Sequence, residues 1–275
     1  MTTFFKKCLL FLSNIHYILL RLMRKFVFSD EFLLKYGKHV PYYRVNTNQF
    51  RPELIVDEYN KYFDKNEISW KGKKILEIGC GKTNSTGYEI SARSNSEVFL
   101  AEPFVVFDQV ADNIFLTQIS KKYNLTKEAL AKMVTRVKSF REIPFGHIDI
   151  VVSSSVLEHV SNLNKLLEEV TSVSKPEVKM LHIVDYRDHF FKYPYHFLQF
   201  SHYVWNNFLN PGDLTRTRQS EHLRIFDQYG YKTEILYEKK DPKEFEKIYQ
   251  NIDKCFDKND PTLSIGLSAI LVSKK

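Results

Sequence analysis

The sequence contains few cysteines, and none of them are close together. Cys8, Cys80 and Cys255 are its three cysteines, and they lie far apart along the chain. Disulfide frameworks and zinc sites are recognised by cysteines at short, regular spacings. We therefore expect free thiols in a reducing compartment, and no metal site.

Acidic residues are absent from the first 29 positions. The basic residues there are Lys6, Lys7, Arg21, Arg24 and Lys25. At about 100° per residue, Lys7, Asn14, Arg21 and Lys25 form one narrow stripe of a helix. The other side is apolar and consists of Phe4, Cys8, Phe11, Leu12, Ile15, Ile18, Leu19, Leu22 and Phe26. The pattern predicts a basic amphipathic helix with a wide apolar face.

No apolar run in this segment is long enough to cross a bilayer, which takes roughly 20 residues. Three interpretations stay open for it. It is an in-plane membrane helix, a helix packed on its own domain or on a dimer partner, or a cleaved targeting segment. The third is the weakest, because no small-x-small cleavage site follows the apolar run.

Glycine is also scarce, with 9 in the chain, and three of them stand in "KKILEIGCGKTNSTG", Lys73 to Gly87. A P-loop needs a glycine five residues before Gly81, and Leu76 occupies that place. The dinucleotide fingerprint needs a third glycine where Asn84 stands. The loop therefore favours a ligand without a pyrophosphate.

The rest of the chain alternates short apolar strands with helical patterns. Its 275 residues, 43% of them hydrophobic, are enough for one α/β domain with additions. The predicted strands are Ile75–Ile78, Val98–Ala101, Val134–Lys138, Ile148–Val152, Met180–Val184, Tyr231–Tyr237 and Leu263–Val272. The predicted helix starts include Val105, a helix capped by Thr126 and one capped by Ser161. This alternation predicts a doubly wound, mostly parallel seven-stranded sheet with an antiparallel edge.

Polar residues follow the predicted strands where such sheets bind ligands, at the carboxyl ends. The first strand ends in Gly79-Cys80-Gly81, the second in Glu102, and the fourth in three serines beginning at Ser153. A carboxylate at the tip of the second strand is placed to accept hydrogen bonds from ribose hydroxyls. The pattern favours a nucleoside ligand.

"LEIGCG", the acid that ends the second strand, and "IDIVVSSSVLEHV" together resemble the class I S-adenosylmethionine-dependent methyltransferases, over about residues 71–185. The resemblance implies a Rossmann-like fold with S-adenosylmethionine as cofactor. It assigns the methionine end of the cofactor to Glu77, Gly79, Cys80 and Gly81, and the ribose to Glu102. Ser153 and Phe140 complete the implied cofactor residues, with Phe140 after the third strand near the adenine position.

An aromatic-rich segment follows the fifth strand, and we expect it to form an acceptor cap at about residues 186–220. The simpler alternative is that these aromatic residues form the apolar core of the cap. The patterns "HxxDxRDHF" and "RxRxSEHxxxF" are similar to methyltransferases that act on bacterial surface polysaccharides. This looser resemblance implies a sugar hydroxyl as the acceptor, on a glycan that is free or lipid-linked.

Transfer to a hydroxyl requires a base that removes its proton. His189, oriented by Asp185 or Asp188, is the leading candidate, and His159 in "LEHV" is the second. Arg216 and Arg218 are expected to hold a phosphate or carboxylate on the acceptor. For each group, a purely structural role is the competing interpretation.

The sequence thus predicts an O-methyltransferase of surface-glycan biosynthesis, with three segments: 1–29, the amphipathic helix; 30–70, a linker; and 71–275, the methyltransferase domain. We expect it in the cytoplasm, as a peripheral protein at the inner face of the cytoplasmic membrane. The alternatives are a methyltransferase of a lipid, quinone or small metabolite, and a non-catalytic membrane adaptor. The net charge of +7 favours anionic partners, but it is concentrated near the N-terminus, so a nucleic acid acceptor is not expected.

Overall fold

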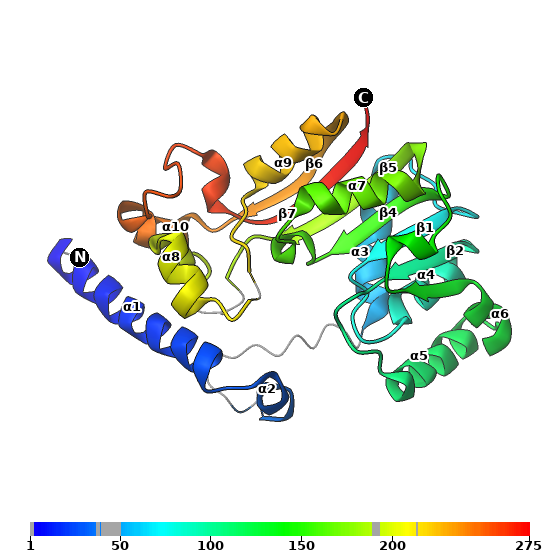
Figure 1. Cartoon of the computed structure of the whole chain (residues 1–275), viewed down its shortest axis with the longest axis horizontal. Helices are drawn as coiled ribbons and strands as arrows, with labels where there is room; N and C mark the ends of the chain where they lie inside the picture. Colours follow the sequence, from blue (N-terminus) through cyan, green and yellow to red (C-terminus); the bar gives the residue numbers. More distant parts are fainter. Residues whose placement is uncertain (1–2, 37–38, 40–50, 189–192, 213) are drawn as a thin grey trace. The chain divides into compact units, whose positions relative to one another are not determined.

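The computed structural model of the chain describes residues 3–36, 39, 51–188, 193–212 and 214–275 (Figure 1). The helices are α1 Thr3–Phe26, α2 Asp30–Tyr36, α3 Pro52–Lys65, α4 Ser85–Ser94, α5 Gln109–Lys122, α6 Lys127–Lys132, α7 Leu163–Val173, α8 His202–Val204, α9 Gln219–Gln228 and α10 Pro242–Ile248. The strands are β1 Lys74–Ile78, β2 Glu97–Ala101, β3 Val134–Val137, β4 Ile148–Ser154, β5 Ser174–Asp185, β6 Tyr231–Lys240 and β7 Ile265–Lys274.

The strands form one seven-stranded sheet in the order β3-β2-β1-β4-β5-β7-β6. The pairs from β3 to β5 are parallel, and the sheet has an antiparallel edge, so the predicted fold class is confirmed. In the register, Ile78 stands opposite Ala101 on β2 and Ser153 on β4. Parallel pairing brings the carboxyl ends of β1, β2 and β4 to the same edge of the sheet.

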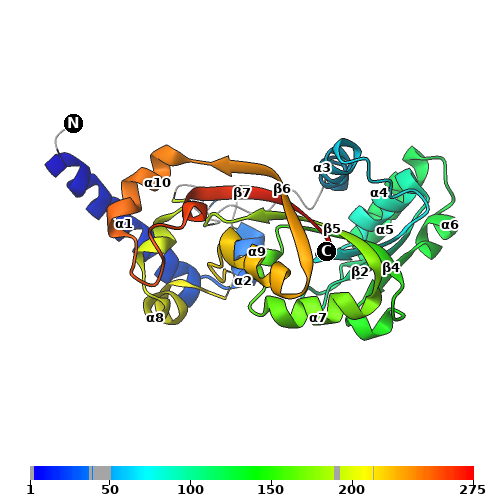
Figure 2. The same ribbon diagram turned by 90° about the horizontal axis from the view of Figure 1, so that it is seen from above.

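The central strands are buried on both faces, as expected of parallel strands covered by helices. Four of the five residues of β1 are buried, and β2 shows the same pattern. Helices α3, α4 and α5 pack in succession, and α7 lies on the opposite face of these strands from α4 (Figure 2). The apolar runs of the sequence therefore become the core of the sheet.

Two predicted helix starts are wrong, because the side chain directly before each helix caps it at a later residue than expected. Helix α5 begins at Gln109 and not at Val105, since the Asp108 carboxylate accepts a hydrogen bond from the Ala111 backbone N–H at 3.0 Å and caps the helix there. Asn162, and not Ser161, caps α7. The prediction that Thr126 caps α6 is confirmed.

The chain divides into two compact units. Unit 1 consists of Met1–Asn46, Asp185–His222 and Tyr237–Ser268, and unit 2 consists of Thr47–Val184, Leu223–Leu236 and Ala269–Lys275. Each unit has its own apolar cluster. The segment boundaries expected from the sequence, near residues 29 and 70, stay a prediction.

Within the described residues, none of the helices has the length and apolar character needed for a bilayer crossing. The three cysteines are free thiols, as expected. Cys8 is exposed, whereas Cys80 and Cys255 are half-buried.

Candidate functional site

The loop after β1 takes a shape that requires its glycines. Gly79 and Gly81 have φ values of 76° and 73°, in the left-handed region that side chains disfavour. A Cβ on Gly79 would lie 2.5 Å from Val156 Cγ2, so that position also has no room for a side chain. The Gly79 N–H donates to the carbonyl oxygen of Ala101 at 2.9 Å, which ties the loop to the end of β2. The loop is thus held open beside the carboxyl ends of the strands.

Glu102 lies directly after β2 and is buried. Its Oε2 accepts a hydrogen bond from the Gly81 N–H at 3.2 Å, and its Oε1 accepts from the N–H groups of Phe104 and Val105 at 3.1 Å each. A carboxylate offers about four acceptor positions, so three backbone donors leave about one. Glu102 therefore shapes the glycine loop and keeps capacity for a hydroxyl donor, which fits the ribose role expected of it.

Glu77, on β1, is the most strongly perturbed carboxyl group of this region. It is buried, and it accepts hydrogen bonds from Thr86 Oγ1 and, at 3.5 Å, from the Tyr59 hydroxyl. Burial raises the pKa of Glu77, and the two hydrogen bonds lower it. Burial has the larger effect, so the pKa is about 7. A cationic group placed beside it would favour the ionised form. This environment fits the positively charged methionine end of the expected cofactor.

Arg136, on β3, holds the outer side of the glycine loop. Its Nη2 donates to the Gly81 carbonyl oxygen at 2.6 Å, and its Nη1 lies 3.1 Å from Cys80 Sγ. The guanidinium also lies 5.1 Å from the centre of the Phe107 ring. Burial raises the pKa of the Cys80 thiol well above its usual range, so Cys80 is not a nucleophile. The sequence analysis missed Arg136, because no motif marks it.

The remaining predicted residues of unit 2 have different surroundings. Ser153 is fully buried, and its Oγ lies 2.8 Å from His182 Nδ1 on the neighbouring strand β5. His159 ends a short 3₁₀ turn, Leu157–His159, and is exposed. Phe140 begins another 3₁₀ turn, Phe140–Glu142, that Ser139 caps. Their cofactor and catalytic roles stay predictions.

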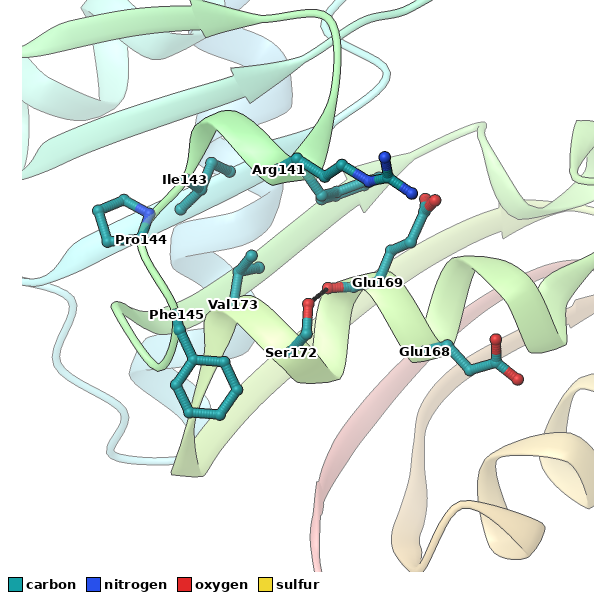
Figure 3. Close-up of a pocket in the computed structure, with 9 residues that line it drawn as sticks. Arg141, Ile143, Pro144, Phe145, Glu168, Glu169, Ser172 and Val173 are labelled. Carbon is teal, nitrogen blue, oxygen red and sulfur yellow. Dashed lines mark hydrogen bonds between the residues drawn. The ribbon is translucent and has the colours of Figure 1, made fainter.

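A hollow of about 570 Å³ lies between this second 3₁₀ turn and helix α7 (Figure 3). Its lining residues are Phe140, Arg141, Ile143, Pro144, Phe145, Glu168, Glu169, Ser172 and Val173. Phe140 is the one predicted cofactor residue among them. The hollow lacks the glycine loop and Glu102, so we do not assign the cofactor to it.

Apart from His159 of unit 2, the described residues predicted for acceptor chemistry lie in unit 1. The leading one, His189, lies outside the described residues. Asp185 pairs with Arg187, whose Nε and Nη2 lie 2.8 and 2.7 Å from its two oxygens. Asp188 is buried and accepts hydrogen bonds from the Tyr17 hydroxyl and from Arg21 Nη2, both on α1. Both carboxylates thus have structural partners, and their role in orienting His189 stays a prediction.

Arg216 and Arg218 are buried and not surface arginines. Arg218 donates to the carbonyl oxygens of Tyr186, Leu263 and Ile265 at 2.6, 3.1 and 2.7 Å. Arg216 donates in the same way to the carbonyl oxygens of Phe197 and Phe200. Burial lowers the pKa of Arg218 to about 10. Both guanidinium groups therefore brace the backbone of unit 1, and acceptor binding by them stays a prediction.

His222 is an acceptor-side candidate that the sequence analysis did not assign. It is buried, and its Nδ1 lies 2.8 Å from the Tyr186 hydroxyl, one residue past the end of β5. Burial lowers the pKa of His222 to about 4, with a further contribution from Arg218. The imidazole is therefore neutral near pH 7 and able to accept a proton. Its place in "RxRxSEH" was the signal that could have identified it.

Comparison with known proteins gives a consistent family. A family model described as a methyltransferase domain matches residues 47–234. The ubiquinone biosynthesis O-methyltransferase of Rhodopseudomonas palustris (strain BisA53) is 24% identical over 214 residues, which cover 70% of this chain and 76% of that protein.

Two solved structures illustrate the structural matches. A SAM-dependent methyltransferase from Archaeoglobus fulgidus is 17% identical, with a TM-score of 0.48, and the match covers 90% of this chain and 100% of that one. Haemonchus contortus phosphoethanolamine N-methyltransferase 2, in complex with S-adenosyl-L-methionine, is 13% identical, with a TM-score of 0.47 and coverage of 92% and 59%. At these values the structural matches carry no argument about chemistry.

Proposed function

Because the chain belongs to the methyltransferase-domain family, whose model matches residues 47–234, we propose that it transfers the methyl group of S-adenosylmethionine to a hydroxyl on an aromatic ring of a quinone-like acceptor. The observation that carries methyl transfer from S-adenosylmethionine is the glycine loop after β1, whose Gly81 N–H donates to the Glu102 carboxylate. For a hydroxyl acceptor, the proposed base is His222, a buried imidazole whose Nδ1 lies 2.8 Å from the Tyr186 hydroxyl. A relative named for ubiquinone biosynthesis O-methylation supports the ring.

The chain's own residues have separate tasks in this proposal. Bound S-adenosylmethionine supplies an electrophilic methyl group on a sulfonium. Glu102 binds the ribose hydroxyls, Glu77 faces the charged methionine end, and the turn at Gly79 lets backbone approach the cofactor. His222 accepts the proton that the acceptor hydroxyl loses, while Tyr186 holds the imidazole in place.

The acidity of the acceptor hydroxyl favours an aromatic ring. A histidine whose pKa is lowered to about 4 is a weak base. Phenolic hydroxyls, with a pKa of about 10 as in tyrosine, lose a proton far more readily than sugar hydroxyls do. A phenol or quinol therefore leaves a smaller difference in pKa between acceptor and base than a sugar does.

The sugar acceptor expected from the sequence is the second candidate. Its support is the pattern that contains Arg216, Arg218 and His222, which is similar to methyltransferases of surface polysaccharides. The structure gives the two arginines backbone partners, which weakens that support. The relative from Rhodopseudomonas palustris is named for ubiquinone biosynthesis and not for a sugar.

The test is a transfer assay with the full-length protein and radiolabelled S-adenosylmethionine. The acceptors are a catechol with a short isoprenyl tail, the same compound with its hydroxyls already methylated, and a lipid-linked oligosaccharide. We expect label in the catechol alone. Label in the oligosaccharide alone would transfer the proposal to the second candidate, and label in the fully methylated control would contradict hydroxyl chemistry altogether.

A further inference from the structure

Helix α1 exposes the opposite side from an ordinary surface helix. From Cys8 to Phe26, every exposed side chain is apolar, and every polar or charged one is at least half-buried. The exposed ones are Cys8, Leu9, Phe11, Leu12, Ile15, Leu19, Met23 and Phe26, which we call the apolar face of α1. Soluble monomers rarely expose a contiguous apolar patch of more than a few hundred Å². A helix with this orientation requires a partner for its outer side.

The polar side of α1 is fixed to unit 1 by specific contacts. Arg21 forms a buried ion pair with Asp188. Asn14 and Gln199 exchange two hydrogen bonds between their side-chain amides, at 2.9 and 3.1 Å. Rotating the helix to turn its apolar face inward would break these bonds and leave a buried charge unpaired. The orientation is therefore a property of the fold.

These contacts decide an orientation that the sequence left open. The three stripe residues Asn14, Arg21 and Lys25 all contact unit 1, Lys25 through its Nζ, which donates to the Asn206 carbonyl oxygen at 2.7 Å. Periodicity identified the stripe, but it carried no information about which side meets the protein.

The exposed apolar surface continues past the end of α1. Val27 is exposed, and Phe28 stacks on Phe32 of α2 with ring centres 5.2 Å apart. Phe32 and Tyr36 are also exposed, and Lys35 Nζ lies 5.1 Å from the centre of the Tyr36 ring. Aromatic rings beside lysines are typical of residues at a membrane–water interface.

We propose that the apolar face of α1 lies in the headgroup region of an anionic lipid membrane, with the helix in the membrane plane. A helix of this type buries its apolar face about 5–10 Å deep. Arg21 is buried in its ion pair, so Arg24 and Lys25 of the last turn are the basic residues that supply positive charge near the lipid phosphates. The expected location at the inner face of the cytoplasmic membrane is one setting for such a surface.

Charge favours lipid over a second copy of this chain. Helix α1 contains no acidic residue, so two copies packed face to face would bring only like charges together at the rim. Anionic lipid supplies the complementary charge. The inference does not depend on which acceptor is methylated, because it rests on α1 and on its contacts within unit 1.

The test is flotation of the full-length protein with vesicles of phosphatidylglycerol and phosphatidylcholine at low salt. Leu12 and Leu19 are 60% and 54% exposed, and their replacement by glutamine should keep the helix intact. We expect L12Q/L19Q to lower the partition coefficient by about tenfold for each leucine removed from lipid. The matched control is L54Q/L125Q, which changes two leucines of unit 2 with exposures of 45% and 41%. It should float like the wild type.

Three results would overturn the proposal. One is a wild-type protein that does not float at low salt. Another is equal flotation of L12Q/L19Q and the control. The third is a wild-type dimer in sedimentation that L12Q/L19Q converts to a monomer while neither protein binds vesicles, which would assign the face to a second copy. Loss of binding to vesicles of pure phosphatidylcholine would support the proposal that α1 requires anionic lipid.

Discussion

At the scale of single residues, Glu102 has the most clearly defined role. Its carboxylate accepts hydrogen bonds from one backbone N–H of the glycine loop, at Gly81, and from two N–H groups that follow β2, at Phe104 and Val105. We predict that Glu102→Ala weakens S-adenosylmethionine binding by about 1.5–3 kcal/mol, the range for hydrogen bonds to a charged group. Glu102→Gln keeps the shape of the side chain without its charge, so it should lose only part of this binding free energy. If calorimetry gives both folded variants the wild-type affinity, Glu102 does not contact the cofactor.

The base can be identified by comparing histidines. We predict that His222→Ala lowers turnover by roughly 10²–10⁴ with little change in cofactor affinity. Because its pKa is lowered to about 4, the wild-type rate should show no rise through a pKa near 6.5. A catalytic histidine with an ordinary pKa would give that rise. If turnover collapses in His189→Ala or His159→Ala while His222→Ala stays active, His222 is structural.

Glu77 predicts a pH dependence of stability in unit 2. Its pKa is raised to about 7 in the folded state, above the unfolded value of 4.5. Between these two pH values the folded state therefore binds more protons than the unfolded state does. The stabilising effect is complete below pH 4.5 and is lost as the pH rises through 7. This pKa shift corresponds to about 3 kcal/mol of unfolding free energy. We predict that Glu77→Gln gains stability relative to the wild type between pH 5 and 8 in denaturant titrations. If the difference in unfolding free energy between Glu77→Gln and the wild type stays constant from pH 5 to 8, the pKa of Glu77 is not raised.

At the scale of elements, the attachment of α1 depends on one buried ion pair. Arg21 and Asp188 are both fully or nearly fully buried. We predict that either Arg21→Ala or Asp188→Ala costs about 3–5 kcal/mol of unfolding free energy, because the remaining charge stays buried without its partner. The double variant should cost clearly less than the sum of the two. Additive losses in chemical denaturation would show that the pair is not coupled.

The elements that the sequence predicted best are those with local signals. The parallel strands, the glycine loop and the cap at Thr126 follow from apolar runs, turn residues and a single side chain. The start of α5 was missed because Asp108, three residues beyond Val105, caps the helix. Arg136 and His222 act through partners that are distant in the chain, which a pattern of neighbours cannot register.

The same limit applies to α1. Its amphipathic pattern was visible in the sequence. Its orientation, however, depends on Asp188, which lies 167 residues from Arg21 along the chain. The acceptor-side roles stay predictions, because they depend on tertiary contacts and because the leading candidate, His189, lies outside the described residues.

At the scale of the whole molecule, the two units have different tasks in the account. Unit 2 carries the glycine loop, Glu77 and Glu102, and unit 1 carries His222 and the apolar face of α1. A quinone-like acceptor is itself lipid-soluble, so a membrane-facing helix and an aromatic acceptor are compatible properties of one enzyme. Deleting residues 1–28 should leave cofactor binding by unit 2 intact, but it would also remove the partner of Asp188. Substitution on the exposed face is therefore the cleaner test of membrane binding.

The central claim is that this chain binds S-adenosylmethionine through the loop after β1. Isothermal titration of the full-length protein with S-adenosylmethionine tests it most directly. The account predicts saturable binding at one site, weakened in Glu102→Ala by about 1.5–3 kcal/mol and unchanged in L12Q/L19Q. Absence of binding by the folded wild-type protein would contradict the account and would favour a non-catalytic adaptor with this fold.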